Sequence, residues 1–168
     1  MKKSIILSCL LVLFMVSANA QQKNYKLALS LMLQYANQDF KSILGDKIGE
    51  EPSLKSDIYV PTEKLGIGSE KIYKSNTSNV AFYSCTVALT DATAILHDVL
   101  DYVNMKVKAG DFNGEDLTDG KGKNVTQVKN KEGLDILKIV TQYTDDDNFD
   151  NDYFALVIYG KAAQEKMK

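Results

Sequence analysis

Two segments in which apolar residues recur at steps of three and four constrain the fold of this chain most. The first set is Tyr25, Leu29, Met32, Ala36, Phe40 and Ile43. The second set is Ala92, Ile95, Leu96, Val99, Leu100 and Val103. This spacing places each set on one side of an α-helix. Because an isolated helix of this length is marginal in water, each set needs a second apolar surface to pack against.

The flanking residues predict where these two helices begin and end. The first helix is expected to span residues 24–44 and to stop at Gly45. The second is expected to be capped by Thr90 or Asp91 and to end at Gly110, with lysines in its last turn that suit the helix dipole. Both helices are therefore amphipathic and of ordinary length.

Three segments alternate in a way that is typical of β-strands. Residues 80–89, 134–143 and 153–159 are predicted strands, and Tyr83 and Cys85 belong to the better core face of the first. Shorter strands are expected at residues 58–60 and 71–73, whereas residues 111–124 are expected to be a polar loop. The last two long strands should form an antiparallel hairpin across residues 144–152.

This order of elements predicts an α+β fold in a single domain. Helices and hairpin strands that follow one another in this way favour an antiparallel sheet covered on one face by two helices. A unit consisting of a helix and the strands after it is used twice along the chain. The helical stripes and the core faces of the strands bury each other.

The first twenty residues have the layout of a secretory signal peptide. Lys2 and Lys3 precede an apolar run over residues 5–16, and Ala18 and Ala20 offer a small-residue cleavage site. The run is too short for a membrane-spanning helix. We therefore expect residues 1–20 to be removed and residues 21–168 to form one exported domain, in the periplasm or outside the cell. Only Cys85 would remain, so no disulfide can form within that domain.

Charge and composition narrow the classes of partner. The whole chain has a net charge of −2, and loss of the two lysines of the leader changes this to −4. An acidic domain lacks the electrostatic footprint of a nucleic-acid-binding protein. The chain contains no arginine, so it lacks the planar side chain that clamps phosphates and carboxylates with paired hydrogen bonds.

In layout the chain resembles small exported proteins of Bacteroidetes-type bacteria. The resemblance is carried by the spacing of Asp39 and Phe40, Gly45, the tyrosine-bearing strands and the helix over residues 91–103. It implies export, and it implies no particular activity and no site residues.

Tyrosines on the strands are the candidate binding residues. Tyr153 and Tyr159 share one face of their strand, and Tyr143 closes the strand before it. An aromatic sheet face that no helix covers is a common form of binding surface, although tyrosine also favours strands for reasons of packing alone. The sequence thus favours a non-enzymatic domain that binds a protein, an envelope component or a small ligand.

The acidic stretch is a candidate calcium site. Asp146, Asn148, Asp150 and Asp152 alternate as oxygen ligands would. Counted from Asp146, however, the positions that require Gly and Glu in an EF-hand loop hold Asn151 and Val157. A solvated loop whose charges discourage edge-to-edge pairing explains the same residues. A weak calcium-dependent interaction module therefore remains an alternative.

Catalytic groups are sparse. His97 is the single histidine, and it is expected on the polar side of its helix near Asp101, whereas Cys85 is expected to face the core. A nucleophile and its base must lie within hydrogen-bonding reach, so this pair is a poor candidate. A small hydrolase that uses two carboxylates is the enzymatic alternative.

Overall fold

The computed structural model describes residues 24–118, 123–143 and 152–167. The predicted signal peptide, residues 1–20, and most of the acidic stretch lie outside these residues. In the described part of the chain, no helix is long and apolar enough to span a bilayer.

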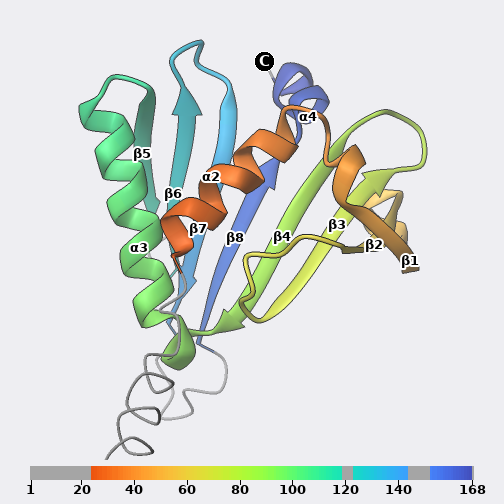
Figure 1. Cartoon of the computed structure of the whole chain (residues 1–168), viewed down its shortest axis with the longest axis horizontal. Helices are drawn as coiled ribbons and strands as arrows, with labels where there is room; N and C mark the ends of the chain where they lie inside the picture. The colour runs from red at the N-terminus through yellow and green to blue at the C-terminus, as the bar shows by residue number, and fades with distance from the viewer. Residues whose placement is uncertain (1–23, 119–122, 144–151, 168) are drawn as a thin grey trace, which may run out of the picture.

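The described chain contains helices, short 3₁₀ turns and eight strands (Figure 1). The helices are α2 (Tyr25–Ala36), α3 (Leu89–Lys108) and α4 (Lys161–Lys166), and the 3₁₀ turns are η1 (Lys41–Ile43) and η2 (Pro52–Leu54). The first four strands are β1 (Leu44–Glu51), β2 (Ser56–Pro61), β3 (Ser69–Ser75) and β4 (Ala81–Ala88). The other four are β5 (Phe112–Thr118), β6 (Lys123–Asn130), β7 (Asp135–Gln142) and β8 (Tyr153–Tyr159).

All eight strands form one antiparallel sheet in the order β1-β2-β3-β4-β8-β7-β6-β5. Each half of the sheet is a four-strand meander that follows a helix, and the halves meet where β4 pairs with β8. The α+β class and the repeated helix-and-strands unit are confirmed, and so are the strands predicted in the regions of β2, β3, β4, β7 and β8.

Helices α2 and α3 lie on the same side of the sheet (Figure 1). Between them and the sheet lies one apolar core, to which α2, α3 and all of the central strands contribute. The largest fully buried side chains are Tyr83, Phe40, Phe154, Leu29, Ile43, Leu65, Ile72, Leu137, Leu156, Ile158, Val99 and Val128. We call this side of the sheet the helix face and the opposite side the open face.

Helix α2 is shorter than its apolar pattern predicted. The Asn24 side chain accepts a hydrogen bond from the Leu27 amide and caps the helix, which ends at Ala36 rather than near residue 44. Asp39 and Phe40 then adopt left-handed backbone conformations. The Asp39 carboxylate accepts a hydrogen bond from the amide of Ala162, so the turn is fixed by a distant contact that periodicity could not reveal. Phe40 is nevertheless fully buried, as its place in the pattern required.

Helix α3 begins directly after β4. Its N-cap is Ala88, which makes no side-chain cap, so the predicted cap at Thr90 or Asp91 is wrong. The Leu89 amide instead donates a hydrogen bond to the carbonyl of Asp152, which satisfies one donor of the first turn. The helix ends at Lys108, and Gly110 follows with φ +76°, as the sequence indicated.

The expected polar loop at residues 111–124 is also wrong. Most of it belongs to the hairpin of β5 and β6, whose strands are paired from Phe112↔Asn130 to Thr118↔Asn124. Strand β1 was likewise missed. Both β1 and β5 are edge strands with only two large apolar residues each, so they carry little apolar alternation for a sequence reading to detect.

The connection over residues 62–68 crosses the helix face of β3 and β4, where neither long helix reaches (Figure 1). It buries Leu65 and Ile67 in the core. Gly68, at φ +52°, lies so close to the backbone of Thr86 that a Cβ there would collide with the Thr86 carbonyl oxygen. This glycine therefore allows the connection to lie flat on the sheet.

We expect Gly68→Ala to lower the free energy of unfolding by about 2 kcal/mol or more, because alanine is strained at this φ and its methyl group has no space. Urea denaturation measures the change. Gly49→Ala in β1 is the matched control, since a Cβ there meets no atom within 4 Å. Equal stability of the two variants would contradict the close approach of this connection to β4.

Candidate functional site

The open face carries a continuous row of large apolar side chains. Cross-strand register places Ile58, Tyr73, Phe82 and Tyr159 side by side on β2, β3, β4 and β8. The rings of Tyr73 and Phe82 stack with centroids 4.8 Å apart and planes within 10°. All four side chains are half-buried, because they pack on each other while no described element covers them. An aromatic row of this kind is typical of protein-binding surfaces.

The next row of the open face is cationic. It runs from Lys71 through Ser84 and Val157 to Lys138. Given the usual spacing of strands, Lys71 and Lys138 stand about 14 Å apart across the sheet. Neither lysine forms an ion pair within the described part of the chain. Two unneutralised cations therefore flank the centre of this face, beside the aromatic row.

Tyr159 ends the aromatic row in a polar setting. Burial raises the pKa of its hydroxyl, and the nearby Asp135 carboxylate raises it further, while a hydrogen bond from Gln127 opposes this. One carboxylate oxygen of Asp135 is buried and has no hydrogen-bond partner among the described residues. A buried acceptor in this state is costly for the fold.

The predicted binding tyrosines lie in different places. Tyr153 and Tyr159 are on the open face, separated by Ala155 and Val157, as the alternation of β8 predicted. Tyr143 is one residue beyond β7 and is 45 % exposed. Sequence reasoning did not single out Tyr73 and Phe82 as neighbours of Tyr159. The alternation within each strand indicates which residues share a face. The order in which the strands pair is also needed to show that the three rings are neighbours.

The candidate calcium ligands cannot be placed as a group. Asp146, Asn148 and Asp150 lie outside the described residues, so the calcium site stays a prediction. Asp152 is described, and it is buried at the start of β8 with its own interactions. Among the described residues no three potential ligands of the His, Cys, Asp and Glu types cluster around a common point.

His97 and Cys85 lie in different environments. His97 is exposed on α3, with Asp98 and Asp101 each 3.8 Å away. Asp101 makes its closer ion pair with Lys26 of α2, at 3.0 Å, and this hydrogen bond lowers the pKa of the Asp101 carboxyl. Cys85 is fully buried, and desolvation raises the pKa of its thiol to about 12. A thiol of this kind is not an activated nucleophile, so the two residues do not form a catalytic pair.

A buried carboxylate holds the connection over residues 62–68 against the sheet. Glu70, only 8 % exposed, accepts hydrogen bonds from the amides of Leu65 and Ile67, at 2.9 and 2.6 Å. It also accepts a short hydrogen bond from the hydroxyl of Tyr83. Three donors satisfy a charge that burial would otherwise make very unfavourable. The cluster is filled by its own partners, so we interpret it as structural.

We expect Glu70→Gln to lower the free energy of unfolding by about 2 kcal/mol or more, because one amide NH₂ would face a backbone donor in a buried place. In a Cys9→Ser background, the reaction of Cys85 with a thiol reagent should also become faster, since loosening of the connection exposes the strand beneath it. Glu63→Gln, an exposed change in the same connection, is the control. Unchanged stability and labelling in Glu70→Gln would contradict the structural role.

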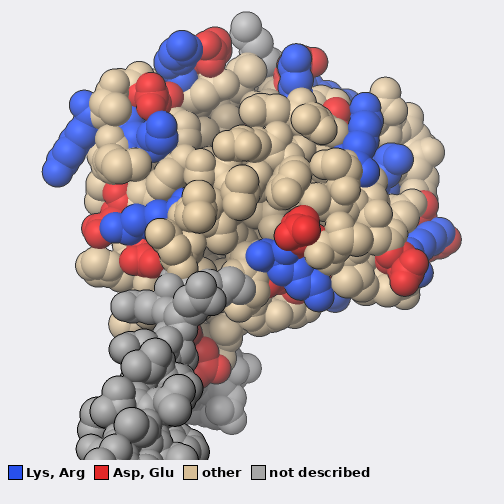
Figure 2. Space-filling view, in the orientation of Figure 1, with Lys and Arg blue, Asp and Glu red and all other residues tan. Residues whose placement is uncertain are grey.

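The helix side of the molecule presents a different surface. Figure 2 shows charged side chains mainly around its margin and uncharged ones across its centre. A hollow of about 280 Å³ opens between α2, α3, β5 and the β6–β7 turn.

No family model matches this chain, and the searches of curated proteins and of solved structures found no match.

Proposed function

We propose that the protein is an exported binding domain that docks a partner protein on the open face of its sheet. The observation that carries the proposal is the row of Ile58, Tyr73, Phe82 and Tyr159, which crosses four strands without a covering element in the described chain. Large aromatic side chains at the centre of a contact provide much of the energy of protein association. Export rests on the layout of the first twenty residues.

The charges of the open face point to the chemistry of the partner. Strand alternation places Lys71, Lys123, Lys129 and Lys138 on this face. Of these lysines, Lys129 lies 3.5 Å from Glu115, and the two central lysines remain unpaired within the described residues. The whole chain is nevertheless acidic. Register also places Glu51, Glu115 and Asp135 on this face, so the positive charge left unpaired within the described residues is concentrated at Lys71 and Lys138. This central pair of lysines favours a partner that presents carboxylates beside apolar side chains.

The geometry favours binding over catalysis. The one histidine of the described chain is exposed on α3, whereas its one cysteine is buried in β4. Of the two buried acidic side chains described, Glu70 is occupied by three donors and Asp152 has partners of its own. No specific observation favours the carboxylate-dependent hydrolase.

A photo-crosslinking amino acid at Tyr73 or Tyr159, in cells that export the protein, tests the docking face. We expect one discrete protein adduct from each position. The same probe at Met105, which is exposed on α3, should give no such adduct. The adduct identifies the partner protein. Lys71→Glu and Lys138→Glu should each slow the association of the protein with this partner about tenfold or more at low salt, because each substitution reverses a charge that attracts carboxylates.

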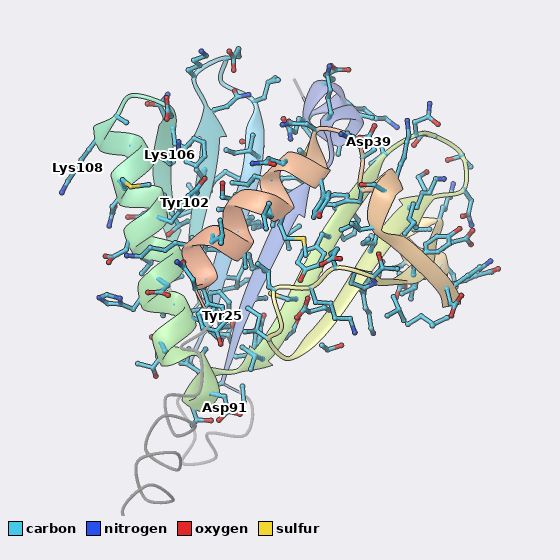
Figure 3. All side chains as sticks on the ribbon, in the orientation of Figure 1. Tyr25, Asp39, Asp91, Tyr102, Lys106 and Lys108 are labelled. Carbon is cyan, nitrogen blue, oxygen red and sulfur yellow. The ribbon has the colours of Figure 1, made fainter. Side chains whose placement is uncertain are left out.

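Lys108→Glu is the matched charge reversal, because Lys108 lies at the end of α3 and points away from the sheet (Figure 3). Equal slowing by this control would show a general effect of net charge and contradict the proposal. Adducts of similar yield from Met105 would also contradict it. An adduct with a second copy of the chain would identify the open face as a self-association surface instead.

A further inference from the structure

The hollow between the helices is continuous with a second, smaller one. The larger, about 280 Å³, and the smaller, about 170 Å³, share Leu33, Asn37, Phe112 and Asn130 as lining residues. Most of their lining residues come from the C-terminal half of α2, from α3, from β5 and from the β6–β7 region. In Figure 1, α2 and α3 diverge toward their C-terminal ends in front of β6 and β7. We call the two hollows together the amide groove. Its combined size is near the lower end of small-molecule sites.

The floor of the amide groove is apolar. Leu33 and Phe112 line both hollows, Ile136 lines the smaller one, and Tyr102 lines the larger one. The rings of Tyr102 and Phe112 meet edge to face, with centroids 6.3 Å apart. In Figure 3, Tyr102 and Lys106 lie on the side of α3 toward α2. A flat apolar ligand face could therefore rest on this floor.

Two wall amides are held in fixed orientations. The Oδ1 atom of Asn130 accepts hydrogen bonds from the amides of Glu132 and Leu134, at 3.1 and 2.9 Å, which leaves its NH₂ group as a donor. The Nε2 atom of Gln164 donates to the carbonyl of Tyr159 at 2.7 Å, which leaves its Oε1 as an acceptor. Gln164 is only 6 % exposed and lines the smaller hollow. The groove thus contains a preset donor and a preset acceptor.

Two further amides stand on the rim. Gln34 and Asn37 are exposed at the end of α2, and their side chains make no hydrogen bond within the described residues. An unpaired carboxamide can donate and accept at the same time. Asn37 lines both hollows, so it is placed to contact a ligand in either of them.

The charges that line the amide groove cancel. Lys106 and Asp111 form an ion pair of 3.0 Å, and this hydrogen bond raises the pKa of the Lys106 ammonium. The other charged residues of the lining are Lys131 and Glu132, one of each sign. A lining without net charge gives no advantage to phosphate or carboxylate ligands. Its selectivity must come from hydrogen bonds and from the apolar floor.

We propose that the amide groove binds a neutral, polyhydroxylated ligand of the size of a sugar ring. Each sugar hydroxyl both donates and accepts, so it matches Asn130, Gln164 and Asn37 without a charge. The C–H face of the ring matches the floor at Leu33 and Phe112. The site is on the helix face, so it is separate from the proposed docking of a protein on the open face.

The proposal is tested by titrating the isotope-labelled protein with glucose and with N-acetylglucosamine. The side-chain NH₂ resonances are monitored by NMR during each titration. We expect the resonances of Asn37 and Asn130 to shift at millimolar sugar. The affinity should fall about tenfold or more in Asn37→Leu, which removes a rim amide. Gln38→Leu is the matched control, because Gln38 is the adjacent exposed amide and does not line the groove.

Inorganic phosphate and triglycine are titrated in parallel. Shifts of these amide resonances with triglycine alone would identify a peptide site. Shifts with phosphate alone would identify an anion site. Either result would overturn the proposal. So would the absence of any shift with both sugars, or equal weakening by Gln38→Leu. If Asn37→Leu loses its native spectrum, Gln34→Leu on the rim of the larger hollow replaces it. The resonances of Tyr73 and Tyr159 report on the open face separately.

Discussion

The antiparallel pairing of β4 with β8 is the interaction on which the rest of the structure depends. Its seven residue pairs join the two four-strand halves into one sheet. In this register Tyr83 and Cys85 lie opposite Ile158 and Leu156, and all four are fully buried. The alternate pairs, such as Phe82 with Tyr159, lie on the other face. Because side chains alternate, a slip of one residue would exchange the two faces of one strand, and the core and the open face would both be lost.

The two faces that this register separates have different properties. The helix face is covered by two amphipathic helices and by the connection that Glu70 holds, and the amide groove opens between the helices. The open face keeps its aromatic and cationic rows half-exposed. At the β1 edge, four of eight residues are charged, which disfavours pairing of the sheet with further strands. The two proposed binding sites therefore lie on opposite faces of the sheet and share no residues.

The sequence predicted those parts of the fold that are determined by local patterns. The stripe of α3 and the alternation of β4 and β8 mark strongly amphipathic segments, and these were placed correctly. Strands β1, β5 and β6 were missed, because their polar residues owe their conformation to neighbouring strands rather than to their own pattern. The end of α2 at Ala36 depends on the contact of Asp39 with Ala162. The amide groove combines residues from several distant segments, so no local sequence motif predicts it.

Hydroxyl-radical footprinting of the free protein, with oxidised residues identified by mass spectrometry, tests most directly the claim that one face of this sheet is covered and the other is open. The account predicts oxidation of Tyr73, Tyr153 and Tyr159 together with protection of Tyr83 and Phe154. Protection of all five rings would mean that the open face is already covered. Oxidation of Tyr83 and Phe154 at the rate of the others would mean that the helices do not enclose a shared core.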